Sequence, residues 1–197
     1  MFTGIIEELG RVVHVDSLGD SVRMTIHGPV VTSDANIGDS ISVNGVCLTV
    51  TTLEEGAFTA DVMLETLNRT TLGHLADSSP VNLERPVTLA TRLGGHMVQG
   101  HVDGVAEIVA RDHSENWDVV TIKPPVELLK YIVEKGSITV DGTSLTVASV
   151  DDAQFTVSLI LETLANTTLG IRQIGDEVNL EVDVMAKYVE KLMGARA

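Results

Sequence analysis

Hydroxyl, carboxyl and amide side chains recur in this chain at a constant separation of 97 residues. The pairs are Thr49 and Thr146, Glu65 and Glu162, Thr66 and Thr163, and Asn82 and Asn179. Threonine hydroxyls, a carboxylate and backbone groups beside a glycine can hydrogen-bond to a row of hydroxyls or to the amide-like rim of a ring. Single residues of these types more often cap turns or pair across strands, but a whole repeated set indicates one small polar molecule bound twice.

A second set of side chains differs between the two copies. His101 stands opposite Ile5, Cys47 opposite Ser144, Lys135 opposite Gly38, Asp183 opposite Pro86, and Phe2 opposite Val98. Positions where the two copies differ can give the two halves different chemistry, so these positions are the candidates for it. Histidine titrates near neutral pH and suits acid–base work, and a thiol or hydroxyl suits nucleophilic addition. Plainer alternatives remain: Cys47 as a small buried apolar residue, Asp183 as a helix N-cap, and Phe2 as core.

The pairing rests on an internal repeat. Residues 40–84 align with residues 137–181 without a gap, and 21 of the 45 pairs are identical. Upstream of this block the offset is 96, which places Gly4–Glu7 opposite Gly100–Asp103. Two copies of this length indicate a duplicated domain and not a solenoid. We expect units at residues 1–96 and 97–184, followed by a segment at 185–197 that has no counterpart.

Each copy has the alternation and turn signals of short β-strands. Strands are predicted at 40–43, 48–51, 58–62 and 81–84, with a turn at Asn44-Gly45. A closed antiparallel barrel lets a unit of this size leave no bare strand edge, so the predicted fold class is all-β, with two tandem barrels.

Short helical segments interrupt the strands. They are predicted at 67–72 and 164–169, each ended by a glycine, and at 126–131 after Pro124-Pro125, with a weaker counterpart at 29–37. In the last segment Met185, Tyr188, Val189, Leu192 and Met193 fall at helical spacing. This helix either packs on its own barrel or joins subunits.

Composition excludes several classes of protein. The net charge is −15, and the basic patch that a nucleic-acid-binding protein needs is not visible. A single cysteine excludes an intrachain disulfide and favours a reducing compartment. The N-terminus carries acidic residues where a secretory signal has basic ones, and no apolar run is long enough to cross a bilayer. We expect a soluble, cytoplasmic protein with no membrane partner.

Several motifs, taken in order, resemble the riboflavin synthase family over the whole chain. They are MFTGIIEELG, NGVCLTV, the doubled ETLxxTTLG block, the doubled VNLE, and GGHMVQGHVDG between the copies. The resemblance implies six-stranded Greek-key barrels, a C-terminal helix that holds a homotrimer, and no metal or cofactor. It implies that two molecules of 6,7-dimethyl-8-ribityllumazine react in each active site. One transfers a four-carbon unit to the other, which gives riboflavin and 5-amino-6-(ribitylamino)uracil.

The resemblance also carries residues over to this chain. It implies substrate contacts at Gly4, Ile5, Ile6, Cys47, Leu48, Thr49, Asp61, Val62, Met63, Leu64, Glu65, Thr66, Gly100, His101, Val102, Lys135, Ser144, Leu145, Thr146, Ser158, Leu159, Ile160, Leu161, Glu162 and Thr163. It implies functional roles for His101, Cys47, Ser144, Ser40, Asp183 and Phe2. One departure is Val46, where some relatives have a second cysteine. Which barrel holds the donor, and whether lumazine synthase is a partner, stay open.

Two other functions fit part of the pattern. A non-catalytic antenna protein that binds lumazine or flavin would keep the fold but lose residues of the second copy or of the unlike set. Here both copies keep their threonine-rich blocks. A flavin reductase-type barrel would carry a nicotinamide domain with a glycine-rich loop after a strand, and Gly94-Gly95 lacks that context.

Overall fold

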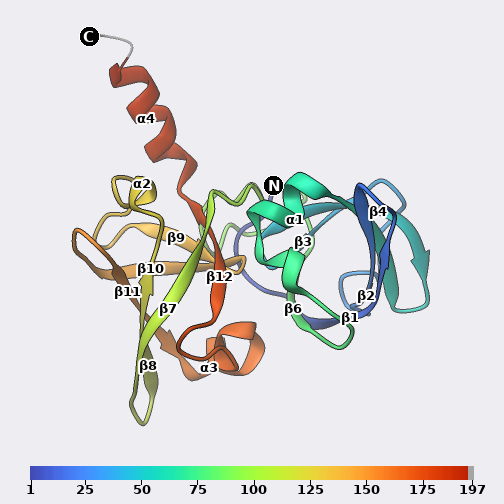
Figure 1. Ribbon diagram of the computed structural model, residues 1–197, viewed down its shortest axis with the longest axis horizontal. Helices are drawn as coiled ribbons and strands as arrows, with labels where there is room; N and C mark the ends of the chain where they lie inside the picture. Colours follow the sequence, from blue (N-terminus) through green and yellow to red (C-terminus); the bar gives the residue numbers. More distant parts are fainter. Residues whose placement is uncertain (195–197) are drawn as a thin grey trace.

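The computed structural model describes residues 1–194, in which twelve strands form two closed barrels (Figure 1). Barrel 1 consists of β1 (Glu8–Ser17), β2 (Ser21–His27), β3 (Ser40–Val43), β4 (Val46–Glu54), β5 (Ala57–Met63) and β6 (Pro80–Glu84). Barrel 2 consists of β7 (Gly104–His113), β8 (Trp117–Lys123), β9 (Ser137–Val140), β10 (Thr143–Val150), β11 (Phe155–Ile160) and β12 (Glu177–Val182). The strands predicted in the first copy are confirmed as parts of β3, β4, β5 and β6.

Both barrels are antiparallel and share one strand order. Barrel 1 runs β1-β2-β5-β4-β3-β6, and its equivalents in barrel 2 run β7-β8-β11-β10-β9-β12. The chain passes from β2 to β3 across the β4–β5 hairpin, so that β2 lies beside β5 in a Greek-key arrangement. Because β6 pairs with β1 and β12 with β7, each barrel is closed. The predicted fold class, two six-stranded antiparallel barrels with a C-terminal helix, is confirmed.

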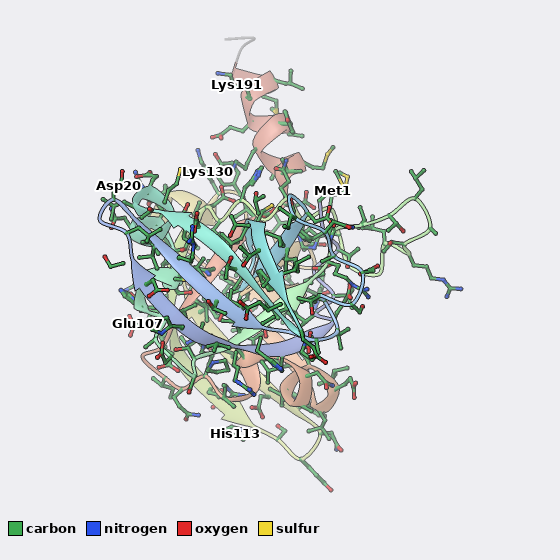
Figure 2. All side chains as sticks on the ribbon, turned by 90° about the vertical axis from the view of Figure 1, so that its right-hand side faces the viewer. Met1, Asp20, Glu107, His113, Lys130 and Lys191 are labelled. Atoms are coloured by element: carbon green, nitrogen blue, oxygen red, sulfur yellow. The ribbon has the colours of Figure 1, made fainter. Side chains whose placement is uncertain are left out.

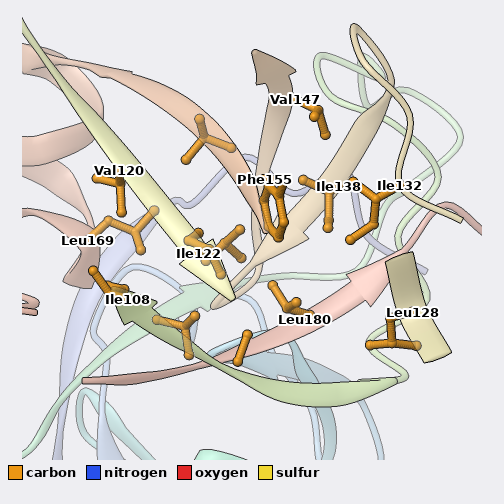
Figure 3. Close-up of a cluster of buried hydrophobic side chains, with 14 of the residues drawn as sticks. Ile108, Val120, Ile122, Leu128, Ile132, Ile138, Val147, Phe155, Leu169 and Leu180 are labelled. Atoms are coloured by element: carbon orange, nitrogen blue, oxygen red, sulfur yellow. The ribbon is translucent and has the colours of Figure 1, made fainter. Parts of the chain in front are cut away.

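Each barrel has its own apolar core because side chains alternate along the strands. In β4, for example, Val46, Leu48 and Val50 point inward and are at most 5% exposed. The core of barrel 2 is built from aliphatic side chains around Phe155 (Figure 3). These cores position the outward-facing residues of β3, β4, β9 and β10, from which the candidate sites are made.

The helical segments after β5 and β11 are each split in two. They form α1 (Leu64–Arg69) and the 3₁₀ helix η1 (Thr71–His74), and α3 (Leu161–Asn166) and η2 (Thr168–Gly170). The break falls at Thr70 and Thr167, which have extended backbones. The Thr70 hydroxyl donates to the carbonyl of Thr66 and accepts from the N–H of Leu72, so it caps both pieces. The prediction had the right place but began each segment three residues late.

The helix after Pro124-Pro125 is confirmed as α2 (Val126–Leu129), but its expected counterpart at 29–37 is wrong. That segment forms turns. The hydroxyls of Thr32 and Ser33 donate to the carbonyls of Gly28 and Val30. Side-chain hydroxyls that compete for these carbonyls favour turns over a continuous helix.

The predicted C-terminal helix is confirmed as α4 (Val184–Gly194), and residues 195–197 of the expected segment lie outside the described part. It projects away from barrel 2, with Lys191 near its far end (Figures 1 and 2). Polar contacts secure its base: Lys187 pairs with Asp103 at 2.5 Å, and Glu190 contacts Lys130 and Tyr131. The residues of its apolar stripe are all more than half exposed. None of the helices in residues 1–194 has the length and apolar character to cross a membrane.

A seam of equivalent groups joins the barrels. The Asn82 side chain donates to the carbonyl of Asp141 and accepts from the N–H of Thr168, at 2.8 and 2.7 Å. Asn179 makes the matching bonds to Asn44 and Thr71. Both asparagines are at most 1% exposed. The expectation that this pair binds the ligand is therefore wrong: it holds the two barrels together.

Candidate functional site

A polar stripe runs along the outer face of barrel 1. Ser40 lies opposite Thr49, and Ser42 lies opposite Cys47, in the β3–β4 ladder. Their neighbours Ile41 and Leu48 point into the core. Alternation in the strands thus directs a thiol and three hydroxyls to one outer face, on which Ser42 is itself buried.

Barrel 2 carries the equivalent stripe. Ser137 lies opposite Thr146, and Thr139 lies opposite Ser144, in the β9–β10 ladder. The two stripes differ in composition at Cys47 and Ser144, where a thiol in barrel 1 is replaced by a hydroxyl in barrel 2.

The segment that runs along each stripe comes from the other copy. Gly4 accepts a hydrogen bond from the backbone N–H of Ser144 at 2.7 Å, and Gly100 accepts one from that of Cys47 at 2.9 Å. Both glycines have positive φ, and a Cβ on either would lie 2.6 Å from the Cβ of Ser144 or Cys47. Only glycine permits this approach. The N-terminus of the chain therefore completes the surface of barrel 2, and the segment with His101 completes that of barrel 1.

Buried carboxylates hold these crossed segments. Glu84 accepts the backbone N–H groups of Thr3 and Gly4, and Glu181 accepts those of Gln99 and His101. Burial raises the pKa of both carboxyl groups. Sequence reasoning missed these residues: the doubled VNLE was read as strand alternation, although its paired glutamates at strand ends were the available signal.

His96 is a second missed residue. Its Nδ1 lies 2.7 Å from the Ser144 hydroxyl, and its Nε2 lies 3.3 Å from that of Thr139. Burial lowers the pKa of His96, against the opposing charge of Asp183, which favours a neutral ring at neutral pH. A neutral imidazole can accept a hydrogen bond from the Ser144 hydroxyl at one nitrogen and donate one to the Thr139 hydroxyl from the other.

A groove of about 440 Å³ opens where the N-terminal segment meets barrel 2. The residues that line it are Gly4, Ile5, Ile6, Glu7, Glu8, Leu9, Thr143, Ser144, Glu162, Thr163, Asn166 and Thr167. Six of them were predicted as ligand contacts: Gly4, Ile5, Ile6, Ser144, Glu162 and Thr163. The volume suits a small organic ligand. A larger groove of about 640 Å³ lies at the seam, and none of the predicted site residues lines it.

Most of the other predicted contacts fall into two groups. Outward-facing side chains are exposed: Thr49, Asp61, Met63, Leu64, Glu65, Thr146, Ser158, Ile160 and Leu161. Side chains directed to a core are Leu48, Val62, Leu145 and Leu159, with Thr66 and Val102 partly buried. Core-facing residues can meet a ligand only through their backbone.

Three of the unlike residues serve structural contacts. Phe2 is fully buried, bridges to Val98 and packs against Gly100. Asp183 accepts the N–H of Met185 and so caps α4. Lys135 is exposed, has a φ of 64° and bonds through its N–H to Val147. Cys47 is partly buried and unpaired with any other cysteine, and the His101 side chain is exposed.

Two closed barrels that each lend a segment to the polar stripe of the other define a duplicated small-molecule-binding protein. In residues 1–194, no cluster of three or more His, Cys, Asp or Glu side chains is arranged to hold a metal ion.

Comparison with known proteins supports this class. The model of the lumazine binding domain matches twice, at residues 3–86 and 99–183. Riboflavin synthase from Mycobacterium tuberculosis is 60% identical over 197 residues, with 98% of each chain covered. Riboflavin synthase from Actinobacillus pleuropneumoniae is 50% identical over 195 residues, with 98% of this chain and 90% of that one covered. The chain therefore belongs to the riboflavin synthase family.

Solved structures show the same architecture. LumP in complex with riboflavin superposes with a TM-score of 0.87 at 27% sequence identity, covering 93% of this chain and 100% of that one. LumP in complex with 6,7-dimethyl-8-(1'-D-ribityl) lumazine gives a TM-score of 0.84 at 26% identity, covering 93% and 99%.

Proposed function

We propose that this chain is a riboflavin synthase, a transferase that converts two molecules of 6,7-dimethyl-8-ribityllumazine into riboflavin and 5-amino-6-(ribitylamino)uracil. The observation that carries the proposal is the doubled, crossed site: the same polar stripe and the same glycine segment occur twice, as two copies of one substrate require. The 50–60% identity to proteins named riboflavin synthase supports the same activity.

The unlike residues divide the work between the two ligands. One lumazine loses a proton from its 7-methyl group, and His101 is the proposed base because its exposed ring stands where the other copy has Ile5. The other lumazine is held as an electrophile, with Cys47, Ser40 or Ser144 as the group that adds to its ring or hydrogen-bonds it. Alignment of two bound reactants supplies much of the acceleration.

Ligand binding is assigned to the residues that both copies share. Threonine hydroxyls and the Glu65 and Glu162 carboxylates hydrogen-bond the ribityl chain and ring, beside the backbone of the crossed segments. Phe2 supports the segment at Gly100, and Asp183 orients a hydroxyl or water beside His96. Lys135, near the end of the barrel 2 stripe, contacts the ligand. The proposed functional units are residues 1–96 and residues 97–184.

The assembly proposed for this enzyme is a homotrimer held by α4. Its apolar stripe is more than half exposed, and packing against copies of itself would bury that surface. Barrel 1 of one subunit would face barrel 2 of the next, a head-to-tail contact that closes into a ring. Sedimentation should give three chains per particle, and a fully active monomer would contradict this assembly. A cytoplasmic location is proposed from the single cysteine, which favours a reducing compartment.

A non-catalytic ligand-binding protein is the second candidate, because the matched LumP structures contain riboflavin or a lumazine. The two functions separate in a titration. An enzyme of this kind binds two lumazines per chain and consumes them, whereas an antenna protein binds one and leaves it unchanged.

Incubation with 6,7-dimethyl-8-ribityllumazine alone tests the activity. We expect one riboflavin and one 5-amino-6-(ribitylamino)uracil for every two lumazines consumed, measured by chromatography, without added metal or cofactor. Binding of the lumazine with no riboflavin formed would overturn the proposal in favour of the antenna function.

A further inference from the structure

We propose that Glu181 is a positioning residue that holds His101 in place, and that Glu84 is its counterpart for the site on barrel 2. Both glutamates end the doubled VNLE motif, which the assignment of ligand contacts leaves without a role. The inference rests on the proposed function, because its kinetic readout is riboflavin formation.

The contacts of Glu181 are direct and short. Its Oε1 accepts the N–H of Gln99 at 2.6 Å, and its Oε2 accepts that of His101 at 2.7 Å. The side chain is 4% exposed, so little water competes for these bonds. A carboxylate that accepts two N–H groups of neighbouring residues fixes both the position and the orientation of the segment between them.

That segment is fixed on its other edge by barrel 1. Gly100, between the two bonded residues, accepts the N–H of Cys47 at 2.9 Å. Glu181 lies on β12 of barrel 2, while Cys47 lies on β4 of barrel 1. The segment is therefore clamped between the barrels, with the His101 side chain left exposed beside the barrel 1 stripe.

Glu84 makes the equivalent clamp in the opposite sense. It lies on β6 of barrel 1, accepts the N–H groups of Thr3 and Gly4 at 2.7 and 2.9 Å, and also accepts the Thr3 hydroxyl at 2.7 Å. The carbonyl of Gly4 then accepts the N–H of Ser144 on barrel 2. Each barrel thus sets the geometry of the site on the other.

The test compares Glu181→Gln and Glu84→Gln with Glu177→Gln. Glutamine keeps the shape, but its NH₂ group would face one backbone N–H donor and its oxygen carries no charge, so one bond of each clamp is lost and the other is weakened. Glu177 is the matched control, because it lies on β12, is exposed and pairs with His74 on η1.

For Glu181→Gln we expect kcat to fall by about 10- to 100-fold with KM changed by less than about threefold, as for a misplaced catalytic group. The amide proton resonances of Gln99 and His101 should move upfield, while those of Thr3 and Gly4 stay in place. Glu84→Gln should give the converse pattern of shifts, and Glu177→Gln should leave kcat and all four resonances unchanged.

A kcat within twofold of wild type in folded Glu181→Gln would overturn the proposal, as would an unchanged His101 amide resonance. If Glu181→Gln does not fold, Glu181→Asp keeps the charge but shortens the reach. A folded Glu181→Asp protein with wild-type kcat would overturn the proposal, and a loss of at least tenfold would support it. If wild type forms no riboflavin, the proposed activity fails, while the amide shifts still report whether the clamp exists.

Discussion

The surfaces on barrels 1 and 2 share a backbone frame but differ in the polar groups that it carries. On barrel 1, Cys47 lies beside the segment with an exposed histidine, His101. On barrel 2, Ser144 lies beside the segment with Ile5, and its histidine is the buried His96. Under the proposed function, the shared frame would recognise one molecule twice. The differences would then give two identical molecules unlike roles.

The flanking charges differ in the same way. Glu65 on α1 pairs with Arg69, whereas its equivalent Glu162 accepts a hydrogen bond from the neutral Asn166. Asp61 pairs with Arg23 at the end of barrel 1, and its equivalent in barrel 2 is the uncharged Ser158. At these two positions barrel 1 has ion pairs that barrel 2 lacks, so exchange of a single residue would not make the two sites identical.

Removal of the His101 side chain, which only the barrel 1 surface has, should produce the largest change in activity. His101→Ala is expected to lower kcat by about 10²- to 10⁴-fold, the usual range for a lost acid–base group, and to leave lumazine binding intact. Steady-state kinetics and a binding titration measure the two quantities. His14→Ala, which alters an exposed histidine on β1, is the control and should keep wild-type kcat. Unchanged turnover in His101→Ala would remove this residue from the mechanism.

Addition of a methyl group at Gly100 should disrupt the barrel 1 surface. Its Cβ would lie 2.6 Å from that of Cys47, and its φ is +79°. The expected loss in the free energy of unfolding is about 2–5 kcal/mol, from left-handed backbone strain and overpacking together. Gly175→Ala is the matched control, because its φ is +92° and no atom lies within 4 Å of the added Cβ. Denaturant unfolding should show a loss of only about 1–2 kcal/mol for the control. Equal losses would mean that the crossed segment can move away from β4.

A double-mutant cycle would measure the coupling between His96 and Ser144, a pair that has no equivalent in barrel 1. His96→Leu leaves the part-buried Ser144 hydroxyl without its partner, which should cost about 0.5–1.5 kcal/mol in the free energy of unfolding. Ser144→Ala in that background should cost less than it does in wild type, with a coupling of about 0.5–3 kcal/mol. Additive losses would contradict the hydrogen bond.

The smallest expected effect is a difference in pH dependence. Because burial lowers the pKa of His96 below its ordinary 6.5, the unfolded chain binds more protons just below that pH, and stability should fall as the pH falls. The contribution is at most about 1.4 kcal/mol per pH unit. The raised pKa values of Glu84 and Glu181 act in the opposite sense but are common to both proteins. Wild type should therefore lose more stability than His96→Leu between pH 7 and pH 5.5, measured by denaturant unfolding; parallel curves would contradict a lowered pKa.

Much of the fold could be predicted because the strands show an alternation of polar and apolar residues, as in residues 40–43. The second copy of the domain shows the same alternation at the equivalent positions. The helix predicted at Pro29–Ile37 was wrong because hydroxyl groups compete there for the backbone carbonyls. Such competition leaves no periodic pattern in the sequence. For the sites, the sequence identified His101, Cys47 and Ser144 as positions where the copies differ. It could not show that Gly4 lies against Ser144, since that contact joins residues far apart in the chain.

The two missed glutamates have a physical reason. Charged side chains are seldom buried, so Glu84 and Glu181 were read as the polar positions of strands. Asn82 and Asn179 were assigned to the ligand because both copies keep them, although a repeated residue can equally serve the contact between copies. Repetition identifies what the halves share, and only the tertiary structure separates binding from assembly.

The crossed segments also bear on how such a protein can change over generations. A substitution near the N-terminus, which belongs to the first half of the gene, alters the surface of the barrel encoded by the second half, and a substitution near Gly100 does the reverse. A substitution that adapts one half to a new ligand therefore also changes the binding surface of the other half, and selection acts on both effects together. Duplication here produced a mutual dependence, and the two halves must evolve as one unit.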